Sequence, residues 1–238
     1  MIVGGNAFNE EQTMKKETDN HIGTDIEDIE DVIKIIETSY DIKFEPNELG
    51  HVKTFGEMTD YIIEKIKLTD KEDCTSQQGF YKLKDAITKI RNIDRGVITP
   101  GQKLTTLFPR QTRRNDIREI EKELGFKLNG LRPRHFITIT LLILVLVSIT
   151  MFFVDWKYAL SGIILTGILS WTSEKMGIEF KDKTIGELTE RMTQRNYVQS
   201  RRDMKTINKK EVEEKIKALF LDELFLDENE LNRETILH

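Results

Sequence analysis

The chain has 238 residues, of which 32% are charged and 38% are hydrophobic, and its formal net charge is −5. This length leaves room for one or two small domains beside a membrane segment, and a single cysteine, Cys74, excludes an internal disulfide. Charge is distributed unevenly: residues 1–60 are acidic, residues 82–134 are basic, and residues 136–173 carry only Asp155 and Lys157.

Residues 1–23 are polar and lack periodicity, so they are expected to form a flexible N-terminal arm. From Thr24 onward, apolar residues recur at helical spacing, and acidic residues in the first turn complement the helix dipole. This first stripe consists of Ile26, Ile29, Val32, Ile33, Ile36 and Tyr40. A second helix is expected from Thr54, with Phe55, Met58, Ile62 and Ile66 as its buried stripe. Together these helices predict an all-α unit over residues 24–70.

Two short phrases stand at the end of the first predicted helix and at the start of the second: Tyr40–Phe44 and Thr54–Met58. In kind and in separation they make residues 29–66 resemble the second half of an acyl carrier protein. In that family a long helix ends in a short, strand-like F-x-I-x-I element, and the last helix opens with T-V-G-D and a hydrophobic residue. The resemblance implies a small helical bundle, and it also implies docking, because basic partner enzymes recognise the acidic helices of carriers.

One departure from the family bears directly on chemistry. Carriers attach phosphopantetheine to the serine of an Asp-Ser-Leu sequence at the start of the long helix. Asp25-Ile26-Glu27 stands at that place here, and Ile26 has no nucleophile. The resemblance therefore implies a carrier-like fold without a prosthetic arm, and we expect no cofactor and no cofactor-binding residue.

Residues 79–134 repeat the theme as the first part of a second carrier-like unit. A helix at 80–90, a loop with the family's I-x-P-x-T-x-L phrase at 98–109 and a long helix at 113–128 follow in the family's order. Arg113, Arg114 and Asn115 occupy the region where the carrier serine would be sought. The last-helix phrase returns within residues 177–200, so the apolar segment lies inside this unit.

Residues 136–173 predict a transmembrane helical hairpin. The first limb, 136–154, has 19 residues without charge, about 28 Å of helix, which matches the hydrocarbon thickness of a bilayer. The second limb, 158–173, is slightly shorter, and Trp156 and Trp171 stand where the two interfaces would lie. The alternative, a buried helix pair in a soluble core, is disfavoured because a core helix normally keeps a solvated face.

Basic residues flank both limbs, which predicts that both termini are cytoplasmic, as in an inner-membrane protein. Gly162, Thr166 and Ser170 form a stripe of small residues on the second limb. Such a stripe permits close contact with another helix, although small residues are also common in membrane helices generally.

Residues 209–238 predict a C-terminal amphipathic helix that resembles the first helix of a carrier. Its apolar face contains Val212, Ile216, Leu219 and Phe220. Because the unit at 24–70 lacks a first helix, residues 209–238 are expected to complete it in a circularly permuted domain. This pairing would bury both apolar stripes, at about 25 cal/mol per Å².

Sequence motifs give no catalytic site and no metal site. The four histidines are scattered, and neither a phosphate loop nor a nucleophile elbow is present. Cys74 has no histidine or second cysteine near it in sequence, which indicates an inert or small buried group. The carboxylates at 27, 28, 30 and 31 form either a solvated helix face or an acidic patch for a basic partner. The arginines at 110–118 favour lipid head groups over nucleic acid, because they stand beside a membrane helix.

The expected function is therefore non-enzymatic: a membrane-anchored, acyl-carrier-like docking module that faces the cytoplasm. Its expected partners are the lipid bilayer and either a protein partner or a second copy bound through the hairpin, with no nucleic acid. Two alternatives remain open: a component of acyl or lipid metabolism that works at the bilayer, and a membrane subunit of a larger complex.

Overall fold

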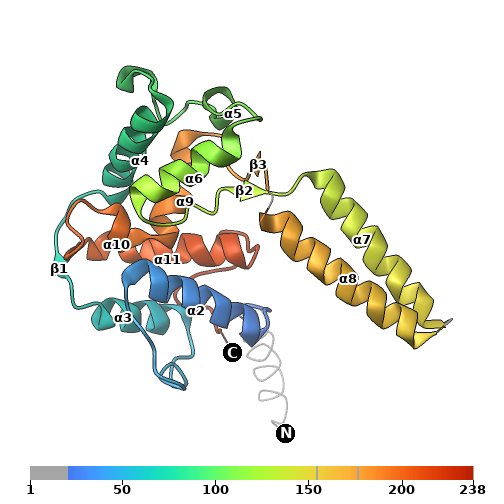
Figure 1. Cartoon of the computed structure of the whole chain (residues 1–238). Helices are drawn as coiled ribbons and strands as arrows, with labels where there is room; N and C mark the ends of the chain where they lie inside the picture. Colours follow the sequence, from blue (N-terminus) through green and yellow to red (C-terminus); the bar gives the residue numbers. More distant parts are fainter. Residues whose placement is uncertain (1–20, 154, 176, 238) are drawn as a thin grey trace, which may run out of the picture. The chain divides into compact units, whose positions relative to one another are not determined.

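The computed structural model describes residues 21–153, 155–175 and 177–237, and the expected arm at 1–23 lies almost wholly outside them. The chain is mostly helical, as Figure 1 shows, in agreement with the expected all-α class. Its elements are α2 (Ile26–Tyr40), α3 (Phe55–Lys65), β1 (Thr69–Asp70), α4 (Thr75–Arg91), η1 (Arg95–Val97), α5 (Leu104–Leu107), α6 (Arg113–Leu124), β2 (Leu131–Arg132), α7 (His135–Thr150), η2 (Met151–Phe153), α8 (Trp156–Lys175), β3 (Glu179–Phe180), α9 (Ile185–Arg195), α10 (Tyr197–Ser200), β4 (Thr206–Ile207) and α11 (Lys209–Glu223).

The chain divides into two compact units. Unit 1 combines the residues up to Gly79 with those from Met192 onward, and unit 2 is Phe80–Arg191. Each unit contains one short ladder: β1 pairs with β4 in parallel in unit 1, and β2 pairs with β3 in antiparallel fashion in unit 2. Helices supply most of the buried apolar residues of unit 1, and residues outside them, such as Val52, Leu231 and Leu237, complete its core.

The core of unit 1 is built by α2, α3 and α11. Each helix contributes an apolar stripe at helical spacing, since only one face of it meets the other helices. The Phe55 and Phe220 rings meet edge to face at 5.4 Å between centroids, which joins α3 to α11. The buried residues of the three helices are Val32, Ile36 and Tyr40; Phe55, Met58 and Ile62; and Val212, Ile216, Leu219 and Phe220.

The expected segment 177–200 is divided between the two units. Helix α9 ends at Arg195, and Tyr197 and Val198 of α10 lie in the core of unit 1. The cause is local, because the Tyr197 ring stacks on Tyr40 with 5.0 Å between centroids. The Ser39 hydroxyl also accepts a hydrogen bond from the Tyr197 N–H at 2.9 Å.

Helix α3 of unit 1 and helix α9, which begins in unit 2, start with the same local geometry. Thr54 and Thr184 stand directly before α3 and α9, and their hydroxyls accept from the N–H of Glu57 and Glu187, each at 3.2 Å. Each glutamate carboxylate in turn accepts a backbone N–H from the residue before its threonine, at 2.8 Å in unit 1 and 2.7 Å in unit 2. This reciprocal capping satisfies N–H groups that a helix start leaves unpaired.

A glycine in each phrase allows a loop to approach the helix start. The Gly56 N–H donates to the Arg233 carbonyl at 2.8 Å, and the Gly186 N–H donates to the Pro100 carbonyl, also at 2.8 Å. A Cβ on Gly56 would lie only 2.8 Å from that carbonyl oxygen, and a Cβ on Gly186 would lie 3.1 Å from its counterpart. Loop 230–237 of unit 1 and loop 98–104 of unit 2 therefore each contact a helix start through one such hydrogen bond.

The long helices of the two units also end alike. Asp41 after α2 and Gly125 after α6 both adopt the left-handed conformation that stops a helix. Glu37 accepts the Phe44 N–H at 2.7 Å, and Glu121 accepts the Leu128 N–H at 2.8 Å. The two long helices are thus closed by the same local contacts. In chain order, unit 1 contributes α2 and α3 before unit 2 and α11 after it, and within unit 2 the α7–α8 hairpin lies between α6 and α9.

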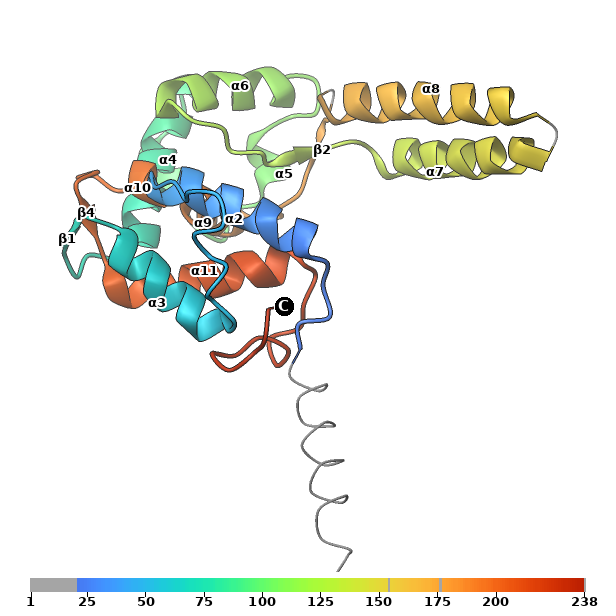
Figure 2. The same ribbon diagram turned by 90° about the horizontal axis from the view of Figure 1, so that it is seen from below.

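Helices α7 and α8 run side by side as a hairpin (Figure 2). Ser148, Ala159 and Thr166 are buried between them, and nearly all large apolar side chains of the hairpin are exposed. Of the described residues, one helix, His135–Phe153, is long and apolar enough to cross a membrane, with a mean hydropathy of 2.7. The expected second span, in α8, does not meet this standard, because Lys157 and several Gly, Ser and Thr residues interrupt its apolar side chains.

Candidate docking groove and surrounding polar sites

A groove in unit 1 lies between α2 and residues 44–50. It has a volume of about 430 Å³ and is lined by apolar and acidic side chains. The apolar lining is Ile26, Ile29, Ile33, Phe44 and Leu49, and the charged lining is Glu30, Glu37, Glu45, Glu48 and Lys34. Four carboxylates against one ammonium give this groove a negative potential, so it suits a ligand that is both apolar and cationic.

Ile26, the residue at the expected carrier-serine position, stands at the mouth of this groove. It is the first residue of α2, and its side chain is 62% exposed. The only hydroxyl nearby in sequence, that of Thr24, donates to the Ile22 carbonyl at 3.2 Å. An exposed isoleucine at a helix start offers a surface for contact and has no group to which an arm could be attached.

Two of the four groove carboxylates hold the groove in shape. Glu48 accepts from the Tyr61 hydroxyl at 2.6 Å and forms an ion pair with Lys65. The Lys65 ammonium, and then the Tyr61 hydroxyl, lower the pKa of Glu48 to about 2. Glu37 binds the Phe44 backbone as described above, so the walls are fixed by hydrogen bonds before any ligand arrives.

The expected carboxylate cluster at the start of α2 lies beside the groove. Glu27, Asp28, Glu30 and Asp31 are all exposed. Asp31 pairs with Lys34 at 2.7 Å, and this contact raises the pKa of the Lys34 ammonium. Among these four carboxylates and Lys34, only Asp31 and Lys34 form an ion pair, so α2 presents an excess of negative charge to solvent.

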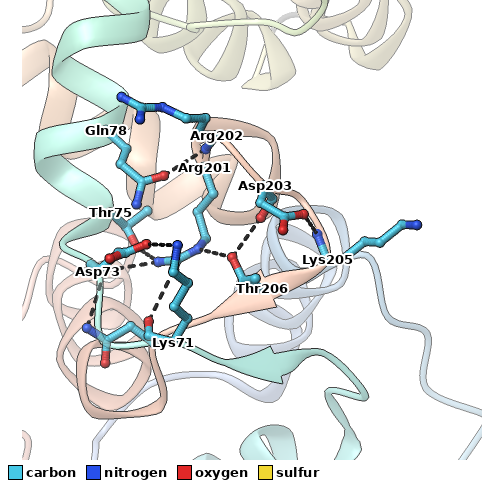
Figure 3. Close-up of polar contacts among 10 residues, drawn as sticks. Lys71, Asp73, Thr75, Gln78, Arg201, Arg202, Asp203, Lys205 and Thr206 are labelled. Atoms are coloured by element: carbon cyan, nitrogen blue, oxygen red, sulfur yellow. Dashed lines mark hydrogen bonds and ion pairs between the residues drawn. The ribbon is translucent and has the colours of Figure 1, made fainter.

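The most deeply buried cation in unit 1 is Arg201, which is 1% exposed (Figure 3). Its guanidinium donates to the hydroxyls of Thr75 at 2.6 Å and Thr206 at 3.1 Å. It also donates to the carbonyls of Asp73 at 3.1 Å and Lys71 at 3.2 Å. Lys71 and Asp73 follow β1, Thr75 begins α4 and Thr206 lies in β4, so Arg201 holds these segments together and the cluster is structural.

Sequence reasoning missed Arg201, and no local signal marks it. It stands in a polar run, and Lys71, Asp73 and Thr75 lie far from it in the chain. Cys74, expected to be inert or a small buried group, is instead exposed just before α4. Cys74 stands in the segment whose Lys71 and Asp73 carbonyls face Arg201, and its own side chain is left on the outside of this segment.

Arg113, sought as part of the second carrier-serine region, is 4% exposed in unit 2. Its guanidinium donates to the carbonyls of Phe108 at 3.2 Å and Ile178 at 2.8 Å, and lies 4.6 Å from the Phe180 ring centroid. This arginine therefore holds the segment that follows α8, around Ile178, and it is unavailable to lipid head groups. Arg110, beside it, pairs with Glu179.

Of the expected stripe of Gly162, Thr166 and Ser170, Gly162 approaches Ser148 of α7 and Thr166 is buried, while Ser170 is half-buried. A Cβ on Gly162 would lie 3.0 Å from the Ser148 Cβ, so glycine permits this close approach. Thr166 is buried and its hydroxyl donates to the Gly162 carbonyl at 2.8 Å. Contact with a partner molecule must therefore use a different face of the hairpin.

Histidines 21, 51 and 135 lie on separate elements, and His238 is outside the described residues. Within those residues, no group of three or more histidine, cysteine, aspartate or glutamate side chains is placed to hold a metal ion. The geometry instead defines a class: a mostly helical protein with two compact units, an acidic groove and an exposed apolar hairpin. No protein-family model, curated protein or solved structure matches the chain.

Proposed function

We propose that this protein is a membrane-anchored, non-catalytic docking module. The observation that carries the proposal is the hairpin, whose large apolar side chains point outward on all sides. Exposed apolar side chains of this number cost about 25 cal/mol per Å² in water, and lipid removes that cost. The hydroxyls of Ser148 and Thr166 bond to carbonyls of their own helices, at 2.8 Å each, as polar groups in hydrocarbon require.

The closure of the hairpin at its base supports the proposal of two spans. Leu131 pairs with Phe180 in the β2–β3 ladder, so the chain enters and leaves the hairpin at one place. If α7 crosses the bilayer, α8 must return through it, and its 20 residues give about 30 Å of helix. Basic residues on both flanks favour the cytoplasmic side for both termini.

The soluble units would then act as degenerate acyl-carrier-like bundles. The matching starts of α3 and α9, the matching ends of α2 and α6 and the acidic α2 support this proposal, and Ile26 supports a role without a prosthetic arm. The ligand of the groove would be a cationic, amphipathic segment of a partner protein. Its apolar side chains would meet Ile29 and Phe44, and its basic groups would meet Glu30 and Glu45.

A second candidate function is favoured by the apolar part of the same groove. Ile26, Ile29 and Ile33 form a wall that an acyl chain could occupy without a covalent arm. This is the role of a component in acyl or lipid metabolism. Binding of a fatty acid that survives charge reversal at Glu30 and Glu45 would favour this second candidate over protein docking.

Three measurements test the proposal. The full chain is expected to float with phosphatidylcholine vesicles and to resist extraction by alkaline carbonate, and a chain left in the soluble fraction would refute the anchor. Intact mass should equal that of the bare polypeptide. An added phosphopantetheine group would restore carrier chemistry and overturn the non-catalytic reading.

Docking is tested by charge reversal in the groove. Glu30→Lys with Glu45→Lys should weaken recovery of a cross-linked cytoplasmic partner at least tenfold. The matched control is Glu64→Lys with Glu214→Lys, which makes the same charge change at exposed sites of unit 1 away from the groove. Equal loss in both pairs would mean that net charge matters and that the groove is not the docking site.

A further inference from the structure

A basic pocket lies in unit 2 at the base of the hairpin. It has a volume of about 590 Å³ and is bounded by α6, by the segment before β2 and by the end of α8. Four cationic side chains line it: Arg114, Arg118, Lys127 and Lys175. These residues come from three different parts of the chain, so the fold brings their charges together.

The charge in this pocket is only partly balanced. Glu121 is its one acidic lining residue, and that carboxylate accepts the Leu128 N–H at 2.8 Å. In the described part of the chain, the Arg118 guanidinium has no hydrogen-bonding or ion-pair partner. Like charges gathered at one place repel one another, and a bound anion relieves that repulsion. The lining therefore favours a negatively charged ligand.

The walls of the pocket are held in place by contacts of their own. The Arg114 guanidinium donates to the Lys175 carbonyl at 2.8 Å, which ties α6 to the last residue of α8. A cation at a helix C-terminus is also favourable toward the helix dipole. Gly130 accepts the Lys181 N–H at 2.9 Å, directly before the β2–β3 ladder. The site is preorganised for binding.

The position along α8 identifies the source of the anion. The Lys175 ammonium lies 3.5 Å from the centroid of the Trp171 ring, and tryptophan marks the membrane interface. Lys175 follows that ring by about one helical turn, 5.4 Å. With the hairpin inserted as proposed, this places its ammonium among lipid head groups. Ile164, Ile168 and Trp171 are all exposed and recur at spacings of four and three on the helix face that leads to Lys175.

We propose that this pocket binds the phosphate of an anionic phospholipid whose acyl chains lie along the exposed face of α8. The inference rests on the proposed insertion of the hairpin and adds a defined lipid site to it. A free phosphate ion would use the same cations, but it would gain nothing from the apolar face at Ile164 and Ile168.

The test uses the full chain in dodecyl maltoside micelles, titrated with dioctanoyl phosphatidylglycerol. We expect saturable binding, and at least tenfold weaker binding by the variant Arg118→Gln with Lys127→Gln. The matched control is Lys103→Gln with Lys122→Gln, which removes the same charge from exposed sites of unit 2 outside the pocket. The control should bind within twofold of the unaltered chain, and circular dichroism should be unchanged in both variants.

Three results would overturn the lipid site. One is equal weakening in the pocket variant and the control, and another is the absence of saturable binding. The third is inorganic phosphate binding as tightly as the lipid, which would assign the pocket to a soluble anion. Flotation of the same samples with phosphatidylcholine vesicles separates the two proposals. A chain that floats but binds no anionic lipid would support membrane insertion of the hairpin and refute the lipid site.

Discussion

Replacement of Gly56 by alanine tests whether the contact between loop 230–237 and the start of α3 stabilises unit 1. The new Cβ would lie 2.8 Å from the Arg233 carbonyl oxygen and 3.1 Å from the Arg233 Cβ, so the loop must move. Such crowding costs about 1–3 kcal/mol, and weakening the 2.8 Å hydrogen bond from Gly56 costs about 1 kcal/mol more. Alanine returns about 1 kcal/mol through its higher helix propensity. The net destabilisation is about 2 kcal/mol.

Amide hydrogen exchange read by mass spectrometry measures this loss locally. A net 2 kcal/mol corresponds to exchange about 30-fold faster in α3 and in loop 230–237, while unit 2 is unaffected. Gly186→Ala, with a clearance of 3.1 Å, should give a smaller increase confined to α9 and loop 98–104. Gly101→Ala is the control, because nothing lies within 4 Å of its new Cβ. Exchange in Gly56→Ala within twofold of the parent would refute the reasoning.

Three further predictions concern charge, a buried cation and the hairpin. Lys65 lowers the pKa of Glu48 from 4.5 to about 2, so the ionised Glu48 stabilises the fold above about pH 5, and this effect is lost as pH falls toward 2. The loss in free energy of unfolding caused by Glu48→Gln, measured by urea unfolding, should therefore shrink over that range. A loss that stays constant with pH would contradict this. Arg201→Leu leaves buried carbonyls and hydroxyls without a donor and should cost about 3–5 kcal/mol in the same assay, whereas a loss below about 1 kcal/mol would exclude a structural role. Gly162→Leu should accelerate amide exchange along α7 and α8 in micelles while Gly167→Leu, which has open space around it, should not; equal effects would place the helix contact elsewhere.

The helices of unit 1 were predictable because their stripes obey helical spacing. Val32, Ile36 and Ile62 were expected in a core and are fully buried. The apolar face of 209–238 was expected to pack against 24–70, and Val212 and Ile216 lie in the same core as those residues. Apolar periodicity indicates which face of a helix is buried. Here the segments 24–70 and 209–238 each had an apolar face without a partner in its own segment, and this was enough to predict that they pack together.

Other features depend on partners that periodicity does not reveal. The short element expected at Tyr40–Phe44 contains no strand, because Asp41 adopts a left-handed conformation that ends α2 and redirects the chain. Arg201 binds residues more than 120 positions away. Of the candidate site, Ile26 and the acidic residues of α2 were visible in sequence. The opposite wall at 44–50 was not, because Glu48 takes part through contacts with Tyr61 and Lys65 on another helix.

The composition of unit 1 from segments on either side of the hairpin orders events during synthesis. Helices α2 and α3 leave the ribosome long before α11, which supplies Val212 and Phe220 to their shared core. At about 5–20 residues per second, the hairpin emerges several seconds ahead of α11. With the hairpin inserted as proposed, the nascent chain would reach the membrane while α2 and α3 still lack α11, and anchoring would precede closure of unit 1.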